Sequence, residues 1–314
     1  MPRTIAVCID TGTKITAYPL ESKKIGVESL DYGYKRFSAQ GEVLPIKENW
    51  LLKIIDTFSI CGVKFVLQNL RHNIKSSGLG GSAAVAVGVC ILANELAGKP
   101  FSDIQLISMA SRIEQDLGVS IVGTQEQSNV LFGGVTDYIW FPWGIPNHPC
   151  SGYGESIRTE LLSPKDYPEL ESRMAIFHTG KTRQSSDVNN AWREALFSSE
   201  GFALHRQKPQ LAYQFREAIR LRDWKQAVET IRKYREIRVK LCAAYIDGAK
   251  EILKTAQLVD CEVFPLGAGG GGAALVFAEE PESLDAFRLK FKGKLEEIPF
   301  KISKKGHELI NPLN

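Results

Sequence analysis

Several features that would assign a sequence to a specialised class of protein are missing here. The six cysteines are scattered, and none forms a CxxC or Cys/His pair with the spacing of zinc ligands, so reduced and mostly buried thiols are expected. No stretch approaches the roughly 20 consecutive apolar residues that a membrane-spanning helix needs. The opening of the chain contains only a short strand-like run rather than a secretory signal. These absences predict a cytoplasmic protein with no membrane partner.

An excess of charge of one sign is missing as well. The chain has 39 basic and 36 acidic residues, which gives a net charge of +3. Proteins that bind nucleic acid usually carry a strongly basic face, so no nucleic-acid partner is expected. The apolar fraction of 44% and the charged fraction of 24% are typical of a globular protein. With 314 residues, the chain is long enough for about two domains and a substantial core.

Patterns typical of strands and helices alternate irregularly along the chain. Apolar or β-branched runs predict strands at residues 4–9, 14–20, 63–70, 138–141, 174–178, 262–266, 273–277 and 295–302. Apolar residues at helical spacing predict helices at residues 47–62, 85–96, 102–117, 208–221, 224–253 and 281–291, the fifth with a break. Because regular βαβ spacing is missing, an α+β fold is favoured. The stretch 142–168, rich in Pro, Gly and Ser, is interpreted as an irregular connection with a domain boundary near its end.

A loop of small residues precedes the predicted helix at 85–96. Gly78, Gly80 and Gly81 would let the backbone approach an anion closely, and a helix start offers unpaired N–H groups and a partial positive charge. Ser82 would either cap this helix or reach a magnesium ion beside bound phosphates. Tight loop–helix packing without any ligand is the alternative. The loop is not a Walker A motif, because no Gly-Lys-Ser/Thr closes it, and its distance from the preceding strand argues against a Rossmann fingerprint.

Two further features carry candidate chemistry. Residues 267–272 hold five glycines in six positions, whereas a plain hairpin needs only one or two. Consecutive glycines lose much conformational freedom on folding, so a close approach of another group is expected there, with an exposed flexible turn as the alternative. Glu114, on a predicted helix, and Glu126, in the predicted loop after it, are candidates for a metal ligand or a base. Taken singly, a glutamate of this kind is more often a solvated surface acid.

These elements, in this order and spacing, resemble the GHMP kinase superfamily and in particular its sugar-kinase branch. Residues 78–84 read Gly-Leu-Gly-Gly-Ser-Ala-Ala, which is similar to the Gly-Leu-Gly-Ser-Ser-Ala-Ala of the family's second motif. The glycine-rich residues 266–272 are similar to the third motif, and residues 125–127 and 132–134 resemble the Gln-Asp-Gln and Phe/Tyr-Gly-Gly of the sugar branch. Residues 177–183 resemble the Tyr-Thr-Gly-x-Ser-Arg segment of heptose-7-phosphate kinases, and residues 299–306 resemble that branch's last strand.

The resemblance implies a two-domain α+β fold and an activity. Residues 1–170 would form an ATP-binding domain like ribosomal protein S5 domain 2, and residues 171–314 a ferredoxin-like domain. The protein would be a kinase that uses ATP and Mg²⁺ and transfers the γ-phosphoryl group to a hydroxyl of a sugar or sugar phosphate. A homodimer is a further option that the resemblance raises.

The resemblance also implies roles for individual residues. Glu126 would stand where the family has its catalytic Asp, and Ser82 and Glu114 would hold magnesium. The residues that would wrap the triphosphate are Ser77, Gly78, Leu79, Gly80, Gly81 and Ser82. The residues that would lie near the acceptor are Gln125, Thr179, Gly180, Arg183, Gly269 and Gly270. An arginine at position 183 would suit a phosphorylated sugar, because a guanidinium can bind phosphate with two hydrogen bonds.

Three departures from the family pattern motivate alternative hypotheses. The first family motif, Arg-x-Pro-x-Arg followed by Gly-Gly-Gly-Thr-Asp, is absent from this sequence. Glu126 replaces Asp, and Phe264-Pro265 stands where the third motif usually has Lys. The alternative is therefore a non-catalytic homologue that binds nucleotide or sugar. A kinase for a non-sugar acceptor such as a mevalonate-like acid is another, which the sugar-branch residues 125–127 argue against.

Overall fold

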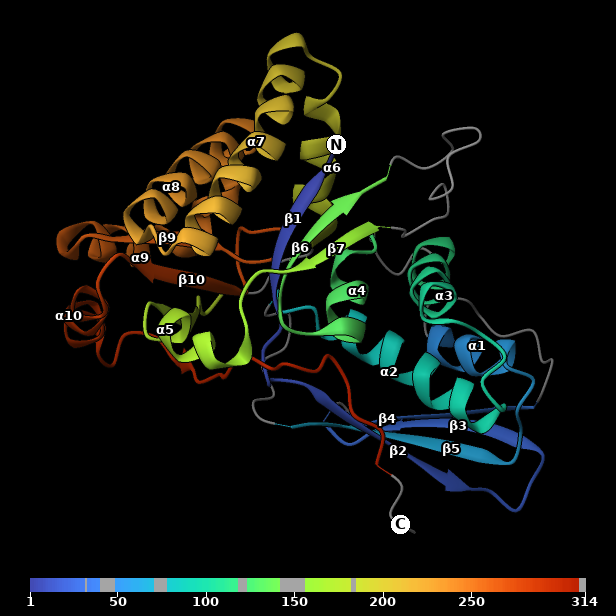
Figure 1. Cartoon of the computed structure of the whole chain (residues 1–314). Helices are drawn as coiled ribbons and strands as arrows, with labels where there is room; N and C mark the ends of the chain where they lie inside the picture. Colours follow the sequence, from blue (N-terminus) through green and yellow to red (C-terminus); the bar gives the residue numbers. More distant parts are fainter. Residues whose placement is uncertain are drawn as a thin grey trace.

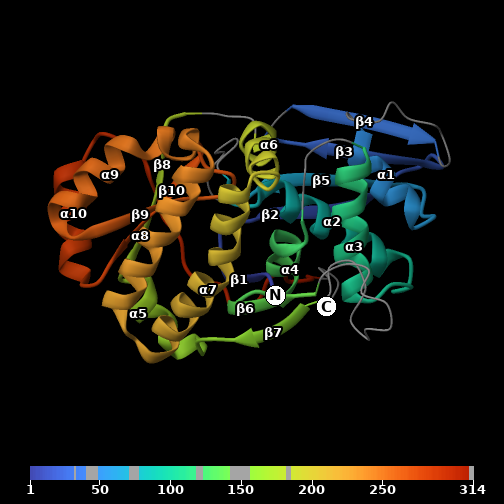
Figure 2. The same ribbon diagram turned by 90° about the horizontal axis from the view of Figure 1, so that it is seen from above.

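The structure is a computed structural model, and it describes residues 1–31, 33–39, 49–70, 78–117, 123–141, 156–181 and 185–310, without the side chains of 185–187. The described strands form three sheets, and helices pack against them (Figures 1 and 2). The mixture of helices and strands without regular βαβ units confirms the predicted α+β class.

The first sheet lies in the half of the molecule drawn in blue and teal (Figure 1). Its strand order is β2-β5-β3-β4, and β3 pairs with β5 in parallel while the other pairs are antiparallel. The strands are β2 Thr13–Pro19, β3 Lys24–Ser29, β4 Tyr34–Ala39 and β5 Val63–Asn69. The helices packed on it are α1 Trp50–Thr57 and α2 Gly81–Leu96, and α3 Asp103–Asp116 packs on these two helices. Fully buried side chains such as Val27, Phe65, Ile54 and Val87 fill the space between sheet and helices.

A second sheet stands in the middle of the molecule (Figure 2). It has the antiparallel order β1-β6-β7, with Ile5 of β1 opposite Asp137 of β6. The strands are β1 Arg3–Val7, β6 Val135–Trp140 and β7 Ser156–Glu160. The short helix α4 Gln125–Phe132 leads into β6 and packs against α2 and α3. The second sheet therefore connects the first sheet's helices with the remainder of the chain.

The third sheet has the order β11-β8-β10-β9 with antiparallel pairing throughout. The strands are β8 Met174–His178, β9 Cys261–Pro265, β10 Ala273–Ala278 and β11 Glu297–Ile298. The helices of this half are α5 Tyr167–Glu171, α6 Ser185–Ala195, α7 Ser199–Leu221, α8 Trp224–Leu241, α9 Lys250–Ala256 and α10 Pro281–Phe291, with 3₁₀ turns at Pro164–Asp166, Ala243–Ala249 and Gln257–Val259. Its connections follow the β-α-β-β-α-β order of ferredoxin-like motifs.

The hydrophobic core is continuous across the predicted boundary at residue 170. Val135 and Leu162 from before the boundary belong to the same buried cluster as Trp224 and Phe277 from after it. Within the part after the boundary, a buried ion pair joins α8 to β9: the Nε of Arg235 lies 2.9 Å from the Oε1 of Glu262. The division into residues 1–170 and 171–314 stays a prediction.

Several sequence-based assignments need correction. Residues 123–129 were expected in a loop, but α4 begins at residue 125, so Glu126 lies in the first turn of a helix. The predicted irregular stretch 142–168 contains β7, and the predicted helix 47–62 is limited to α1. The strands β3 and β4 and the helix α6 were not predicted. Among the described helices, none is both long and apolar enough to cross a bilayer.

Candidate active site

The first glycine loop ends in an open helix N-terminus. Gly78 and Gly80 have φ angles of +73° and +75°, a region that residues with a Cβ rarely adopt. Gly80 is the N-cap of α2, and no side chain caps the first N–H groups of this helix. A Cβ added to Gly81 would meet nothing within 4 Å. The loop therefore presents unpaired N–H groups to an open space, which fits a phosphate group.

The expected capping role of Ser82 is wrong. Ser82 is the second residue inside α2, it is exposed, and the cap position belongs to Gly80. Its role as a magnesium ligand stays a prediction. Ser77, which was expected to begin the phosphate loop, lies outside the described residues.

The two glycine loops touch each other backbone to backbone. A Cβ added to Gly78 would lie 3.1 Å from the carbonyl oxygen of Leu266, and one added to Gly267 would lie 3.1 Å from the Cα of Gly78. Gly267 also has a positive φ, of +59°. The close approach predicted for residues 267–272 is thus made at one end by the first loop. This contact brings residues about 190 positions apart in sequence to one site.

Two carboxylates come together beside the first loop. A Cβ on Gly80 would lie 3.8 Å from Oε2 of Glu126, so this carboxylate stands next to the loop backbone. Burial and the negative charge of Glu114 raise the pKa of Glu126 above its ordinary value. Glu114, on α3, is itself only 1% exposed. Packing of α3 against α4 therefore brings the two acids together.

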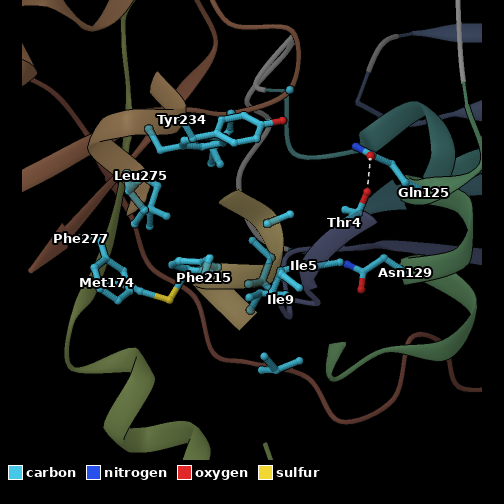
Figure 3. A pocket seen from close by; sticks show the side chains of 18 of the residues that line it. Thr4, Ile5, Ile9, Gln125, Asn129, Met174, Phe215, Tyr234, Leu275 and Phe277 are labelled. Atoms are coloured by element: carbon cyan, nitrogen blue, oxygen red, sulfur yellow. Dashed lines mark hydrogen bonds between the residues drawn. The ribbon is translucent and has the colours of Figure 1, made fainter. Parts of the chain in front are cut away.

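A cavity of about 400 Å³ opens beside Glu126 and the two loops. Figure 3 shows its two unlike sides: Thr4, Gln125 and Asn129 on one, and Met174, Phe215, Leu275 and Phe277 on the other. The polar side chains that line it are Arg3, Thr4, Gln125, Glu126, Asn129, Thr230, Tyr234 and Arg238. The cavity thus has a polar wall beside the carboxylate, and opposite it an apolar surface with Thr230, Tyr234 and Arg238 of α8 as its polar groups.

Two hydrogen bonds orient the polar wall. Trp140 Nε1 donates to Thr4 Oγ1 at 3.0 Å, and Thr4 Oγ1 donates to Gln125 Oε1 at 3.1 Å, drawn as the dashed line in Figure 3. With its oxygen engaged, Gln125 has its amide N–H groups available to a ligand. Asn129 follows one turn after Gln125 on the same helix face, and its buried Oδ1 has no hydrogen-bond partner. The sequence analysis did not identify Thr4 or Asn129 as candidates. The four-residue spacing between Gln125 and Asn129 could have indicated that Asn129 shares a helix face with Gln125.

The remaining glycines of the second loop pack against protein rather than line this cavity. A Cβ on Gly269 would lie 2.1 Å from the ring of Tyr245, and Gly270 N donates to the Tyr245 carbonyl oxygen. The hydroxyl group of Thr179 donates to the Gly272 carbonyl oxygen at 2.9 Å. Thr179, Gly180, Gly269 and Gly270 are not among the described lining residues, and their contact with the acceptor stays a prediction.

Arg183 lies outside the described residues. Within the described part of the chain, no group of three or more His, Cys, Asp or Glu side chains forms a metal site. Glu114, next to Glu126, nevertheless fits as a ligand of a magnesium ion that arrives with a nucleotide, because Mg²⁺ commonly takes one or two carboxylates together with phosphates and water.

The chain is similar in sequence to known proteins. Residues 48–134 match the model of the GHMP kinases N terminal domain. The sequence is 24% identical over 280 residues to D-glycero-alpha-D-manno-heptose 7-phosphate kinase of Campylobacter jejuni, covering 86% of this chain and 78% of that protein.

Solved structures share the fold. A Lin0012 protein from Listeria innocua matches with a TM-score of 0.78 and 16% identity, covering 96% of this chain and 91% of that one. A putative sugar kinase from Campylobacter jejuni matches with a TM-score of 0.71 and 22% identity, covering 97% of this chain and 88% of that one. The resemblance to the GHMP kinases is therefore confirmed: residues 48–134 match the model of their N-terminal domain, and nearly the whole chain shares its fold with a putative sugar kinase.

Proposed function

We propose that this protein is a kinase that transfers the γ-phosphoryl group of ATP to a hydroxyl group of a sugar or sugar phosphate. The observation that carries the proposal is the place of Glu126, which lies beside the Gly80 backbone and also lines the cavity. Glu126 would therefore lie next to both a phosphate bound at the loop and an acceptor bound in the cavity. The similarity to a heptose 7-phosphate kinase supports a sugar as the acceptor.

The first loop would bind the triphosphate. The uncapped N–H groups at the start of α2 and the positive end of its dipole favour an anion, and the open space at Gly81 leaves room for it. Gly78 and Gly80 allow the backbone turn that aims these N–H groups outward. Bound Mg²⁺ would neutralise part of the phosphate charge.

Glu126 would act as the base that receives the acceptor proton. The acceptor hydroxyl oxygen attacks the γ-phosphorus, the bond from that phosphorus to the β–γ bridging oxygen breaks, and the hydroxyl proton passes to the Glu126 carboxylate. The raised pKa of Glu126 favours this role, because a base is most effective when its pKa is near the working pH. Gln125 and Asn129 would orient the acceptor through hydrogen bonds from the polar wall.

The test measures ADP release from ATP and Mg²⁺ with heptose 7-phosphate, fucose, galactose, glucuronate and mevalonate as acceptors. We expect one sugar or sugar phosphate to respond. Glu126→Gln should abolish this turnover while ATP still binds, because the amide cannot accept the proton. Glu95→Gln is the matched control, since Glu95 is an exposed carboxylate on α2 that pairs with Lys99. A wild-type rate in Glu126→Gln would refute the role of Glu126.

The same assay separates the kinase from a non-catalytic homologue. Nucleotide binding is measured in parallel by the shift of the unfolding temperature on addition of ATP and Mg²⁺. Stabilisation by ATP without ADP release for any acceptor would favour a binding protein. A response to mevalonate alone would favour a kinase for a non-sugar acid.

A further inference from the structure

A buried arginine, Arg238, lines the cavity. The side chain of Arg238, on α8, stacks on the ring of Trp192, with its Cζ 3.3 Å from the ring centre, and lies 4.6 Å from the ring centre of Tyr245. One of its terminal nitrogens donates to the Gly267 carbonyl oxygen at 3.1 Å. Arg238 is only 8% exposed, and its buried Nε has no hydrogen-bond partner. This guanidinium is therefore held rigidly with part of its hydrogen-bonding capacity unused.

A second cation lies on the same aromatic ring. The Nζ of Lys208, on α7, is 5.8 Å from the ring centre of Trp192. Burial and the neighbouring charge of Arg238 lower the pKa of Lys208 to about 8. His205 lies one turn earlier, with Nε2 3.1 Å from the Trp192 carbonyl oxygen, and its pKa is lowered by burial, Lys208 and Arg238. Three basic side chains thus share one poorly solvated region.

The expected counter-ion is missing from the described part of the chain, where no carboxylate lies within ion-pair distance of Lys208 or Arg238. The contrast with Arg235 is informative, because that residue is one turn earlier on α8 and equally buried. Arg235 binds Glu262 through two nitrogens, at 2.9 and 3.3 Å. A buried cation without a partner disfavours the folded state, so an external anion that pairs with it would bind favourably.

The location of the cluster indicates which ligand would supply the anion. Arg238 lines the cavity that Glu126 also lines, and its bond to Gly267 places it where the two glycine loops meet. The uncapped helix start at Gly81 is already suited to the nucleotide phosphates. Arg238 lines the cavity from α8, whereas Gln125, Glu126 and Asn129 line it from α4, and Lys208 of α7 adjoins Arg238 at the Trp192 ring.

We propose that Lys208 and Arg238 form an anion subsite that binds the phosphate monoester of the acceptor, so that the substrate is a phosphorylated sugar rather than a neutral one. This inference rests on the proposed kinase function for the identity of the acceptor. Arginine suits the task because its planar group can donate two parallel hydrogen bonds to a phosphate, and the ring of Trp192 holds that plane in place.

The test compares ligand binding to the wild type and to Lys208→Met by calorimetry. The ligands are heptose 7-phosphate, the same heptose without phosphate, and a non-hydrolysable ATP analogue. We expect the wild type to bind the phosphorylated heptose at least tenfold more tightly than the neutral one. Lys208→Met should lose at least tenfold in affinity for the phosphorylated heptose and keep its affinity for the ATP analogue. Arg206→Gln, an exposed cation on the same helix, is the matched control and should change neither.

Inorganic phosphate provides a probe that does not depend on the right sugar. With the ATP analogue present, phosphate should raise the unfolding temperature of the wild type more than chloride at equal ionic strength does, and should not do so for Lys208→Met. Without phosphate, Lys208→Met should unfold no earlier than the wild type, because it removes an unpaired charge. A merely structural lysine would give a less stable variant.

Three outcomes would overturn the subsite. These are equal affinity of the wild type for both heptoses, loss of affinity for the ATP analogue in Lys208→Met, and equal stabilisation of both proteins by phosphate. Failure of the kinase proposal would look different, because ADP release would be absent while phosphate-dependent binding persisted. ADP release with a neutral sugar, unchanged in Lys208→Met, would leave the kinase standing and remove the subsite.

Discussion

Two adjacent glycines at the start of α2 give a sharp prediction, because the structure assigns them opposite responses to the same substitution. Gly80 has a φ of +75°, whereas Gly81 has an ordinary helical conformation and open space where its Cβ would lie. A Cβ on Gly80 would meet Glu126 only at 3.8 Å, an ordinary contact distance. Any effect of Gly80→Ala on folding is therefore due to the backbone conformation and not to a clash.

The magnitudes follow from backbone preferences. An L-residue in the left-handed region costs about 1–2 kcal/mol, so Gly80→Ala should lower the free energy of unfolding by about that amount. Gly81→Ala should raise it by about 0.4–1 kcal/mol, because alanine restricts the unfolded chain without strain in the helix. Equal effects of the two substitutions in denaturant unfolding would refute the assignment of φ at this loop.

Binding of ATP separates the same two variants. If the loop N–H groups hold the triphosphate, the strain in Gly80→Ala should turn these groups away and weaken binding at least tenfold. Gly81→Ala should stay within about threefold of the wild type, since the family pattern that this loop resembles has a serine at this position. Calorimetry with the ATP analogue measures both. Unchanged affinity in Gly80→Ala would remove the loop from the nucleotide site.

Three further predictions concern ionisable groups. Because the raised pKa of Glu126 makes the folded state hold its proton more tightly, stability should fall as the pH rises above the ordinary value of 4.5, and Glu126→Gln should remove this fall in pH-dependent unfolding. The pKa of Lys208, which faces Arg238 and His205, is lowered from 10.5 to about 8 in the folded protein. The free energy of unfolding of the wild type should therefore increase as the pH is raised from about 8 to 10.5, and Lys208→Met should lack this increase in pH-dependent unfolding. Glu262→Gln should lower the free energy of unfolding by roughly 3–5 kcal/mol, since it leaves Arg235 buried without its counter-ion; a loss below 1 kcal/mol would contradict this.

Local sequence patterns predicted the elements whose side chains have a regular apolar period. The strand predicted at 174–178 is β8, and the helix predicted at 281–291 is α10, residue for residue. The unpredicted strand β4 is different, because most of its side chains are exposed and it carries no apolar alternation. It exists because the edge of β3 offers hydrogen bonds to it, which is information from elsewhere in the chain.

The helix α4 shows the same limit within the site. Its sequence, Gln-Glu-Gln-Ser-Asn-Val-Leu-Phe, has too few apolar residues for a helical period, so its helical state depends on packing against α2 and α3. The identity of Glu126 as a candidate was available from the sequence, but its burial beside Glu114 was not. The contact between Gly78 and Gly267 was equally inaccessible, although each glycine cluster stood out alone.

Arg235 and Arg238 show most clearly what the tertiary structure adds. They are three residues apart on α8, and nothing in the local sequence distinguishes a structural arginine from one that lines a cavity. The fold separates them, because β9 brings Glu262 to Arg235, while Trp192 and Gly267 hold Arg238 at the cavity. A buried charge that serves only the fold is paired with an opposite charge of the protein, as Arg235 is with Glu262, so a buried cation without a carboxylate points to a ligand. This reasoning makes the Lys208–Arg238 cluster, rather than the paired Arg235, the place to look for acceptor specificity.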